Sequence, residues 1–117
     1  MSRIALAVAV LAAAAVLVAQ ALGATTLKIS ADKAALKYNK TFLKAPAGKV
    51  AIVMANPAVL PHNVAIRGPG LKPVLGKVVS KGGTSTVSAT LKKGTYTFYC
   101  SVPGHEAAGM KGTLKVG

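Results

Sequence analysis

The sequence predicts an all-β domain, an antiparallel sandwich or barrel of about seven or eight strands. Two observations support this fold class. Short runs of β-branched, aromatic and other apolar residues recur along most of the chain, and turn residues such as Gly, Pro and Asn separate them at short intervals. No internal repeat or low-complexity linker interrupts the series, so the strands are expected to form one domain.

In the first half of the domain the strand signals are short. Residues 27–30 alternate apolar and polar side chains, as a half-buried strand does, and residues 41–43 form a second candidate. A turn is expected over residues 45–48, before the continuous apolar run 50–55, which has the length of a strand rather than of a helix. Only residues 31–36 are expected to hold a helical turn.

The second half of the domain continues the pattern. Residues 62–67 are expected to form a strand that ends at Gly-Pro-Gly, and residues 77–81 are a further strand candidate that leads into a Gly-Gly turn. Residues 84–91 alternate, residues 95–99 give the strongest strand signal of the chain because they read Thr-Tyr-Thr-Phe-Tyr, and residues 113–116 close the series.

Composition excludes several kinds of chemistry. The 117 residues carry 15 Lys and Arg against 2 Asp and Glu, a formal net charge of +13, with one Cys and two His. One Cys cannot form an internal disulfide or supply a zinc site built on two or four cysteines. Asp32 and Glu106 are the only carboxylates, too few for paired-carboxylate hydrolysis or a calcium cage. We therefore expect no enzymatic activity.

The N-terminus resembles a secretory signal peptide. Arg3 precedes an unbroken apolar run over residues 4–19, and Ala21 and Gly23 are small residues suited to a cleavage site. The sequence predicts a signal over residues 1–23, cut after Gly23, and a domain over residues 24–117. The alternative is an uncleaved membrane anchor, for which the run is short. The protein is expected to be exported, to the periplasm or the outer cell surface.

The chemistry of the chain is concentrated in the segment Cys100-x₄-His105-x₄-Met110. His62 is the only other histidine, so both histidines and the single cysteine belong to one candidate set. Thiolate and thioether sulfur suit Cu(I) and imidazole suits Cu(II), and two His, one Cys and a weak axial Met form an electron-transfer copper site. Each residue taken singly is more often structural. Met54, the other possible thioether, lies inside an apolar run and is expected in the core.

The motifs Pro61-His62-Asn63-Val64 and Cys100…His105…Met110 resemble those of the plastocyanin/azurin family of small blue copper proteins, the cupredoxins. The resemblance covers nearly all of the domain and implies a Greek-key β-sandwich with one type 1 copper ion at one end. It implies His62, Cys100 and His105 as equatorial ligands and Met110 as the axial ligand. Asn63 resembles the residue that ties the two ligand loops together in the family.

The ligand spacing departs from the best-known family members. Four residues separate Cys100 from His105 and four separate His105 from Met110, whereas plastocyanins usually have two in the first interval and azurins usually have three in the second. The spacing is closer to that of rusticyanin-like and auracyanin-like proteins. Pro61 before His62 disfavours the strong carbonyl ligand of azurins.

The resemblance implies a mobile one-electron carrier, a monomer that exchanges electrons with exported redox proteins such as cytochromes or oxidases. Val102, Pro103, Ala107 and Ala108, with residues 58–60, are expected to form an apolar rim around His105, and the positive charge favours partners with acidic docking surfaces. A copper chaperone or storage protein with the same ligands is the alternative. Copper oxidases and nitrite reductases need further histidines, and no specific nucleic-acid binding is expected. Membrane contact is expected only through the N-terminal segment, if it is retained.

Overall fold

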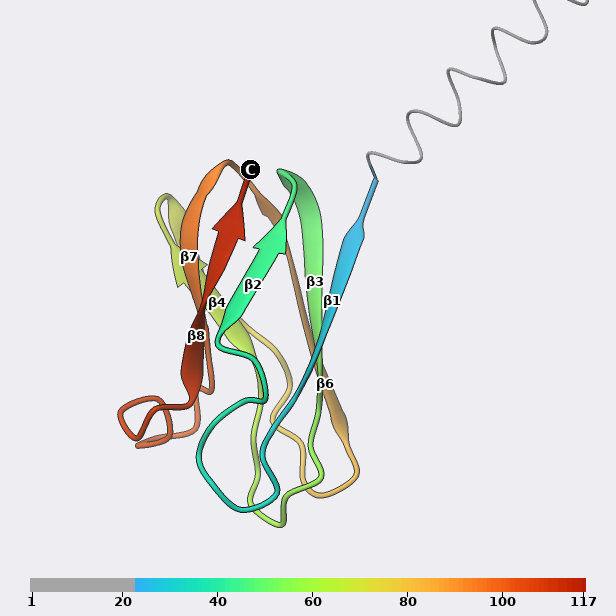
Figure 1. The fold of residues 1–117 in the computed structure, drawn as a ribbon, viewed down its shortest axis with the longest axis vertical. Helices are drawn as coiled ribbons and strands as arrows, with labels where there is room; N and C mark the ends of the chain where they lie inside the picture. Colours follow the sequence, from blue (N-terminus) through green and yellow to red (C-terminus); the bar gives the residue numbers. More distant parts are fainter. Residues whose placement is uncertain (1–22) are drawn as a thin grey trace, which may run out of the picture.

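The structure is a computed structural model that describes residues 23–117. The predicted signal segment, apart from Gly23, lies outside the described residues, so the cleavage site stays a prediction. Within the described part of the chain, no helix is long and apolar enough to cross a membrane. Eight strands make up the fold (Figure 1): β1 (Thr25–Ser30), β2 (Phe42–Ala45), β3 (Gly48–Ala55), β4 (Ala65–Gly68), β5 (Leu71–Leu75), β6 (Thr84–Leu91), β7 (Gly94–Tyr99) and β8 (Lys111–Val116).

The strands form two sheets, with the order β1-β3-β6 in one and β2-β8-β7-β4-β5 in the other. The sheets face each other as a Greek-key β-sandwich, which confirms the predicted fold class. Two pairs, β1 with β3 and β2 with β8, are parallel, whereas the remaining pairs are antiparallel. The sequence did not predict these parallel pairs, because local alternation says which face is buried and nothing about the direction of a distant partner.

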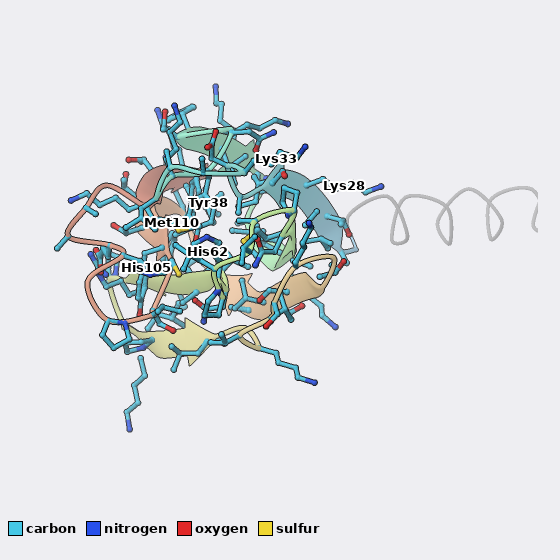
Figure 2. The ribbon with its side chains drawn as sticks, turned by 90° about the horizontal axis from the view of Figure 1, so that it is seen from below. Lys28, Lys33, Tyr38, His62, His105 and Met110 are labelled. Carbon is cyan, nitrogen blue, oxygen red and sulfur yellow. The ribbon has the colours of Figure 1, made fainter. Side chains whose placement is uncertain are left out.

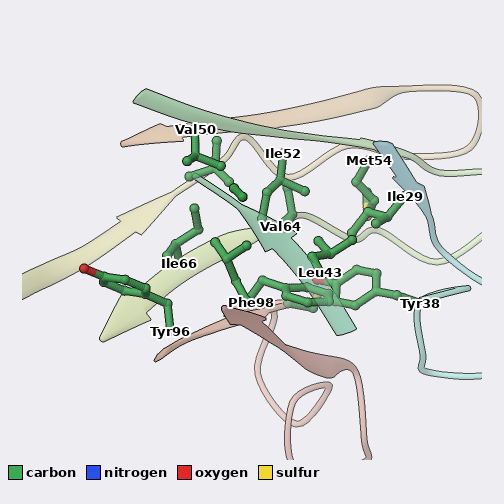
Figure 3. Close-up of a cluster of buried hydrophobic side chains, with 14 of the residues drawn as sticks. Ile29, Tyr38, Leu43, Val50, Ile52, Met54, Val64, Ile66, Tyr96 and Phe98 are labelled. Carbon is green, nitrogen blue, oxygen red and sulfur yellow. The ribbon is translucent and has the colours of Figure 1, made fainter. Parts of the chain in front are cut away.

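The core lies between the sheets and follows the period of two that a strand imposes. On β3 the side chains of Val50, Ile52 and Met54 are fully buried, and on β7 the alternate residues Tyr96 and Phe98 are buried. Figure 3 shows these side chains interdigitating with residues of the opposite sheet. Met54 is thus a core residue, as expected.

Two sequence-based expectations are wrong in detail, and one strand was not predicted. Residues 31–36 form bends and no helical turn, because the Asp32 carboxylate accepts hydrogen bonds from the backbone N–H groups of Ala34 and Ala35 and turns the chain locally. Residues 77–81 are not a strand. The fifth strand is instead β5, at the sheet edge, where Pro73 is tolerated because no ladder hydrogen bond is needed on the open side.

Candidate metal centre

Three of the four predicted ligands meet at the lower end of the sandwich in Figure 1. His62 lies in the β3–β4 connection, Cys100 directly follows β7, and His105 lies in the β7–β8 loop. The Nδ1 atoms of the two histidines are 3.1 Å apart. The Sγ atom of Cys100 is 3.6 Å from Nδ1 of His105 and 4.0 Å from Nδ1 of His62. Figure 2 looks onto this end and shows Met110 beside the two histidines.

His62 is held in place by backbone pairing with the β5–β6 connection. Its N–H and C=O bond to the C=O and N–H of Val79 at 3.0 and 2.9 Å, an isolated bridge that precedes β4. The strand predicted over residues 62–67 therefore begins later, at Ala65. The His62 ring is 1% exposed. Burial, and next the charge of His105, lower its pKa, so the ring is neutral near pH 7 and a lone pair is available to a metal.

The β7–β8 loop is closed on itself by backbone hydrogen bonds. The N–H of Cys100 donates to the C=O of Met110, and the N–H of Met110 donates to the C=O of His105, both at 3.1 Å. Gly104 and Gly109 have φ values of 84° and 117°, which side-chain-bearing residues rarely adopt. The loop thereby folds back so that Cys100 and the fully buried Met110 lie at its base, with the half-buried His105 between them in sequence.

Asn63 joins the two ligand-bearing segments, as its resemblance implied. Its buried side chain accepts a 2.7 Å hydrogen bond from the N–H of Ser101 and donates to Ser101 Oγ at 2.7 Å. The same amide donates to the C=O of Gly76 at 2.9 Å. Since Asn63 follows His62 and Ser101 follows Cys100, these bonds set the separation of two predicted ligands.

Tyr38 holds the loop between β1 and β2 over the same end of the molecule. Its phenol donates a 2.7 Å hydrogen bond to the C=O of Asn63, and its ring packs against Phe98 with a centroid separation of 5.6 Å. Burial raises the pKa of the Tyr38 phenol, so it stays protonated as a donor. Sequence reasoning missed Tyr38, since nothing in the local pattern pairs it with Asn63.

Arg67 is a second residue that sequence reasoning missed. Its guanidinium donates from both terminal nitrogens to the two carboxylate oxygens of Glu106, and it lies 4.4 Å from the centre of the Tyr99 ring. The hydrogen bond with Arg67 lowers the pKa of the Glu106 carboxyl. Because Arg67 lies on β4 and Glu106 directly follows His105, the ion pair ties β4 to the β7–β8 loop.

The donor atoms fit a copper ion. Two imidazole nitrogens and one sulfur separated by 3.1 to 4.0 Å have the spacing of ligands that share one transition-metal ion, each at about 2.0–2.3 Å from it. Two facing Nδ1 atoms beside a thiol are also a poor hydrogen-bonding group on their own, because at most one proton lies between them. A profile of the family described as "Copper binding proteins, plastocyanin/azurin family" matches residues 25–117. The chain belongs to this family.

Copper is therefore the cofactor of this cupredoxin. Among solved structures, it is similar to the auracyanin of Roseiflexus castenholzii, with 27% identity over 81% of this chain and 98% of that chain and a TM-score of 0.70. Auracyanin A of Chloroflexus aurantiacus, described as a "blue" copper protein, gives 27% identity over 81% of this chain and 100% of that chain, also with a TM-score of 0.70. The predicted auracyanin-like similarity is thus confirmed. A comparison with curated proteins gives no match.

Proposed function

We propose that this cupredoxin is a one-electron carrier in which His62, Cys100 and His105 are the equatorial copper ligands and Met110 is the axial one. The convergence of both histidines and the only cysteine of the chain at one end of the sandwich supports this assignment most strongly. Bound copper supplies reversible one-electron chemistry between Cu(I) and Cu(II), for which thiolate, imidazole and thioether donors are suited.

The role of the protein in electron transfer is to hold the copper ligands in fixed positions. His62 is fixed by its bridge to Val79, and Cys100 is fixed by the closed loop and by the bonds of Asn63 to Ser101. His62 and Cys100 are each 1% exposed, so neither side chain has solvent-filled space to move into. Donors that stay in place in both oxidation states keep the reorganisation on electron transfer small.

His105 is the proposed point of electron exchange, because it is the only one of the four proposed ligands that is partly exposed. Exposed apolar residues lie on the neighbouring loops: Val59 and Leu60 are 78% and 49% exposed. Ala58, expected in this rim, is instead buried, because its N–H bonds to the Asn56 side chain. Val78, next to the Val79 that pairs with His62, is 47% exposed and extends the rim.

Positive charge lies on another loop at this end of the molecule, the connection between β1 and β2. The loop that Tyr38 holds over the metal end carries Lys33, Lys37 and Lys40, all exposed. Its only carboxylate, that of Asp32, bonds to backbone N–H groups. We propose that these lysines attract partners with acidic docking surfaces, and that the domain works after export as a monomer. Redox proteins dock through small interfaces, so the apolar rim and the charged loop together are large enough for a docking surface.

Adding Cu(II) to the purified protein should give one intense visible absorption band at a 1:1 ratio, through thiolate-to-copper charge transfer, and a reversible one-electron wave in voltammetry. Visible and EPR spectra and voltammetry test this. Copper that is bound with these spectra but lost rapidly to a chelator would instead favour the chaperone or storage function. A colourless product would contradict the proposed site.

Salt should slow electron exchange with an acidic cytochrome much more than with a neutral one, because exposed charges are screened beyond about 8–10 Å at physiological salt. Replacing Lys33, Lys37 and Lys40 by glutamine should remove most of this salt dependence, whereas Ala107→Glu should slow exchange with both partners. Stopped-flow rates against ionic strength measure both effects.

The matched control is Ala47→Glu, the same substitution in the exposed β2–β3 turn at the opposite end of the sandwich. Its exchange rate with a neutral partner should equal that of the unmodified protein. Equal slowing by both substitutions, or rates with the acidic partner that do not depend on salt, would contradict the proposed docking surface.

A further inference from the structure

We propose that Arg67 is a positioning residue for the copper site, acting through Glu106 to hold the loop that carries His105. The inference rests on the proposed function, since it takes His105 to be a copper ligand. Within residues 23–117, Arg67 makes no hydrogen bond with any of the four proposed ligands. A positioning effect on copper must therefore pass through the loop, whereas its charge can act directly through space.

The backbone of β4 directs Arg67 toward the loop. The pairing register of β4 with β5 shifts between Ile66 and Gly68, so Arg67 lies at an irregularity of the strand. Bulges of this kind commonly re-aim a side chain beside a functional site. The guanidinium then lies over the Tyr99 ring, a cation–π contact that orients the plane of its donors.

The contact between Arg67 and Glu106 is bidentate. Both terminal nitrogens of the guanidinium donate, one to each carboxylate oxygen, which fixes orientation as well as distance. The two residues are 39 positions apart in the chain. Glu106 is one of two carboxylates in a chain of net charge +13, so a carboxylate immediately after His105 is not a consequence of general acidity.

The loop has few other attachments. Its first residue, Ser101, is tied to Asn63, and its base is closed by the hydrogen bond from the N–H of Cys100 to the C=O of Met110. Within the described residues 23–117, the side chains of residues 102–109 make hydrogen bonds outside the loop only through His105 and through Glu106. Val102 also packs against the core at the start of the loop. Without Arg67, His105 would be the one residue of 102–109 whose side chain forms a hydrogen bond outside the loop within the described part of the chain.

The ion pair is placed to act locally rather than on the whole fold. The side chains of Arg67 and Glu106 are 40% and 29% exposed. Ion pairs at this exposure contribute little to global stability. Removing the pair should therefore leave the melting of the copper-free protein almost unchanged, while residues that orient metal ligands typically change metal affinity or activity by about 10-fold or more.

Variants of this ion pair can distinguish a positioning effect on the copper site from a purely electrostatic effect. Removing Arg67 leaves a negative carboxylate beside the copper site and should lower the reduction potential, because negative charge favours Cu(II). Removing Glu106 leaves a positive charge and should raise the potential. Removing both cancels the change in charge but not the loss of the attachment.

The test compares copper-loaded Arg67→Met, Glu106→Gln and the double variant, with Lys115→Met as the control. Lys115 is an exposed cation on β8, and it makes no hydrogen bond with the loop among the described residues. The measurements are the rate of copper release to a chelator, the electron self-exchange rate by NMR line broadening, and the reduction potential by voltammetry. Arg67→Lys, which keeps the charge but not the two-pronged contact, serves as a second variant.

All three pair variants should release copper about 10-fold faster and exchange electrons more slowly, with the double variant no worse than either single one. The reduction potential should fall in Arg67→Met and rise in Glu106→Gln. In the double variant it should return to the value of the unmodified protein. Arg67→Lys should keep the potential and show part of the faster release. Lys115→Met should release copper at the original rate.

Opposite potential shifts without any change in release or exchange would reduce the pair to an electrostatic effect and overturn the inference. A lower melting temperature of the copper-free variants with unchanged copper properties would overturn it too, by assigning the pair to the fold. Failure of the unmodified protein to form the blue site would instead contradict the proposed function, before any variant is compared.

Discussion

Replacing Cys100 by alanine should abolish the intense visible absorption of the Cu(II)-loaded protein. The chain has no other cysteine, so no thiolate remains to transfer charge to copper. The side chain is buried but small, and the loss of one sulfur atom should lower the free energy of unfolding of the copper-free protein by only about 1 kcal/mol. Visible absorption and EPR spectra at equal copper and protein concentrations measure the effect.

Met54→Leu is the control for this change, because it removes a buried sulfur from the core rather than from the site. It should keep the colour at a small cost in stability, since leucine and methionine have similar volumes. A Cys100→Ala protein that still gives the intense band would show that Cys100 is not the source of the absorption.

Replacing Asn63 by leucine should both destabilise the fold and loosen the metal centre. The substitution removes three hydrogen bonds and leaves the N–H of Ser101 and the C=O of Gly76 without the partners seen here. Leaving buried groups unpaired should lower the free energy of unfolding by about 3 kcal/mol. Copper release should also accelerate, because the bonds between Asn63 and Ser101 join the segments of His62 and Cys100.

Asn56→Leu provides a comparison of the same chemistry at the same end of the fold. The Asn56 side chain is also buried and also makes three hydrogen bonds, to the backbone of Ala58, Leu60 and Val79. None of these bonds reaches the β7–β8 loop. Chemical denaturation should give similar losses for the two variants, whereas the copper spectrum should change more in Asn63→Leu. The reverse order would contradict the linking role of Asn63.

Most strands were predictable because the pattern that indicates a strand lies within the segment itself. The alternation over residues 84–91 and the Thr-Tyr-Thr-Phe-Tyr run gave strands that the structure places almost where they were expected. The edge strand β5 was missed because Pro73 interrupts its pattern, and residues 77–81 were misassigned because their apolar side chains belong to a connection that pairs only once, at Val79. Of these apolar residues, Val79 packs against the core, whereas Val78 is 47% exposed.

The metal cluster was predictable for a different reason, because the chain contains few residues that can bind copper. With two histidines and one cysteine in the chain, few other combinations of donors exist, and the structure brings His62, Cys100 and His105 together. The supporting contacts of Tyr38 and Arg67 could not be predicted in this way. Each joins segments more than twenty residues apart in the chain through a common residue type, so only the three-dimensional arrangement identifies the partner.

The parallel pairing of β2 with β8 has a consequence for how the protein is made. It joins residues 42–45 to residues 113–116, so the larger sheet is incomplete until nearly the whole domain is available. Sandwiches dominated by such distant pairings fold in about milliseconds to seconds, far more slowly than helical bundles. Throughout that interval Cys100 is an accessible thiol, open to oxidation and to intermolecular disulfide formation. Refolding under reducing conditions, with copper added only after the last strand has paired, is therefore the order of steps that suits this topology.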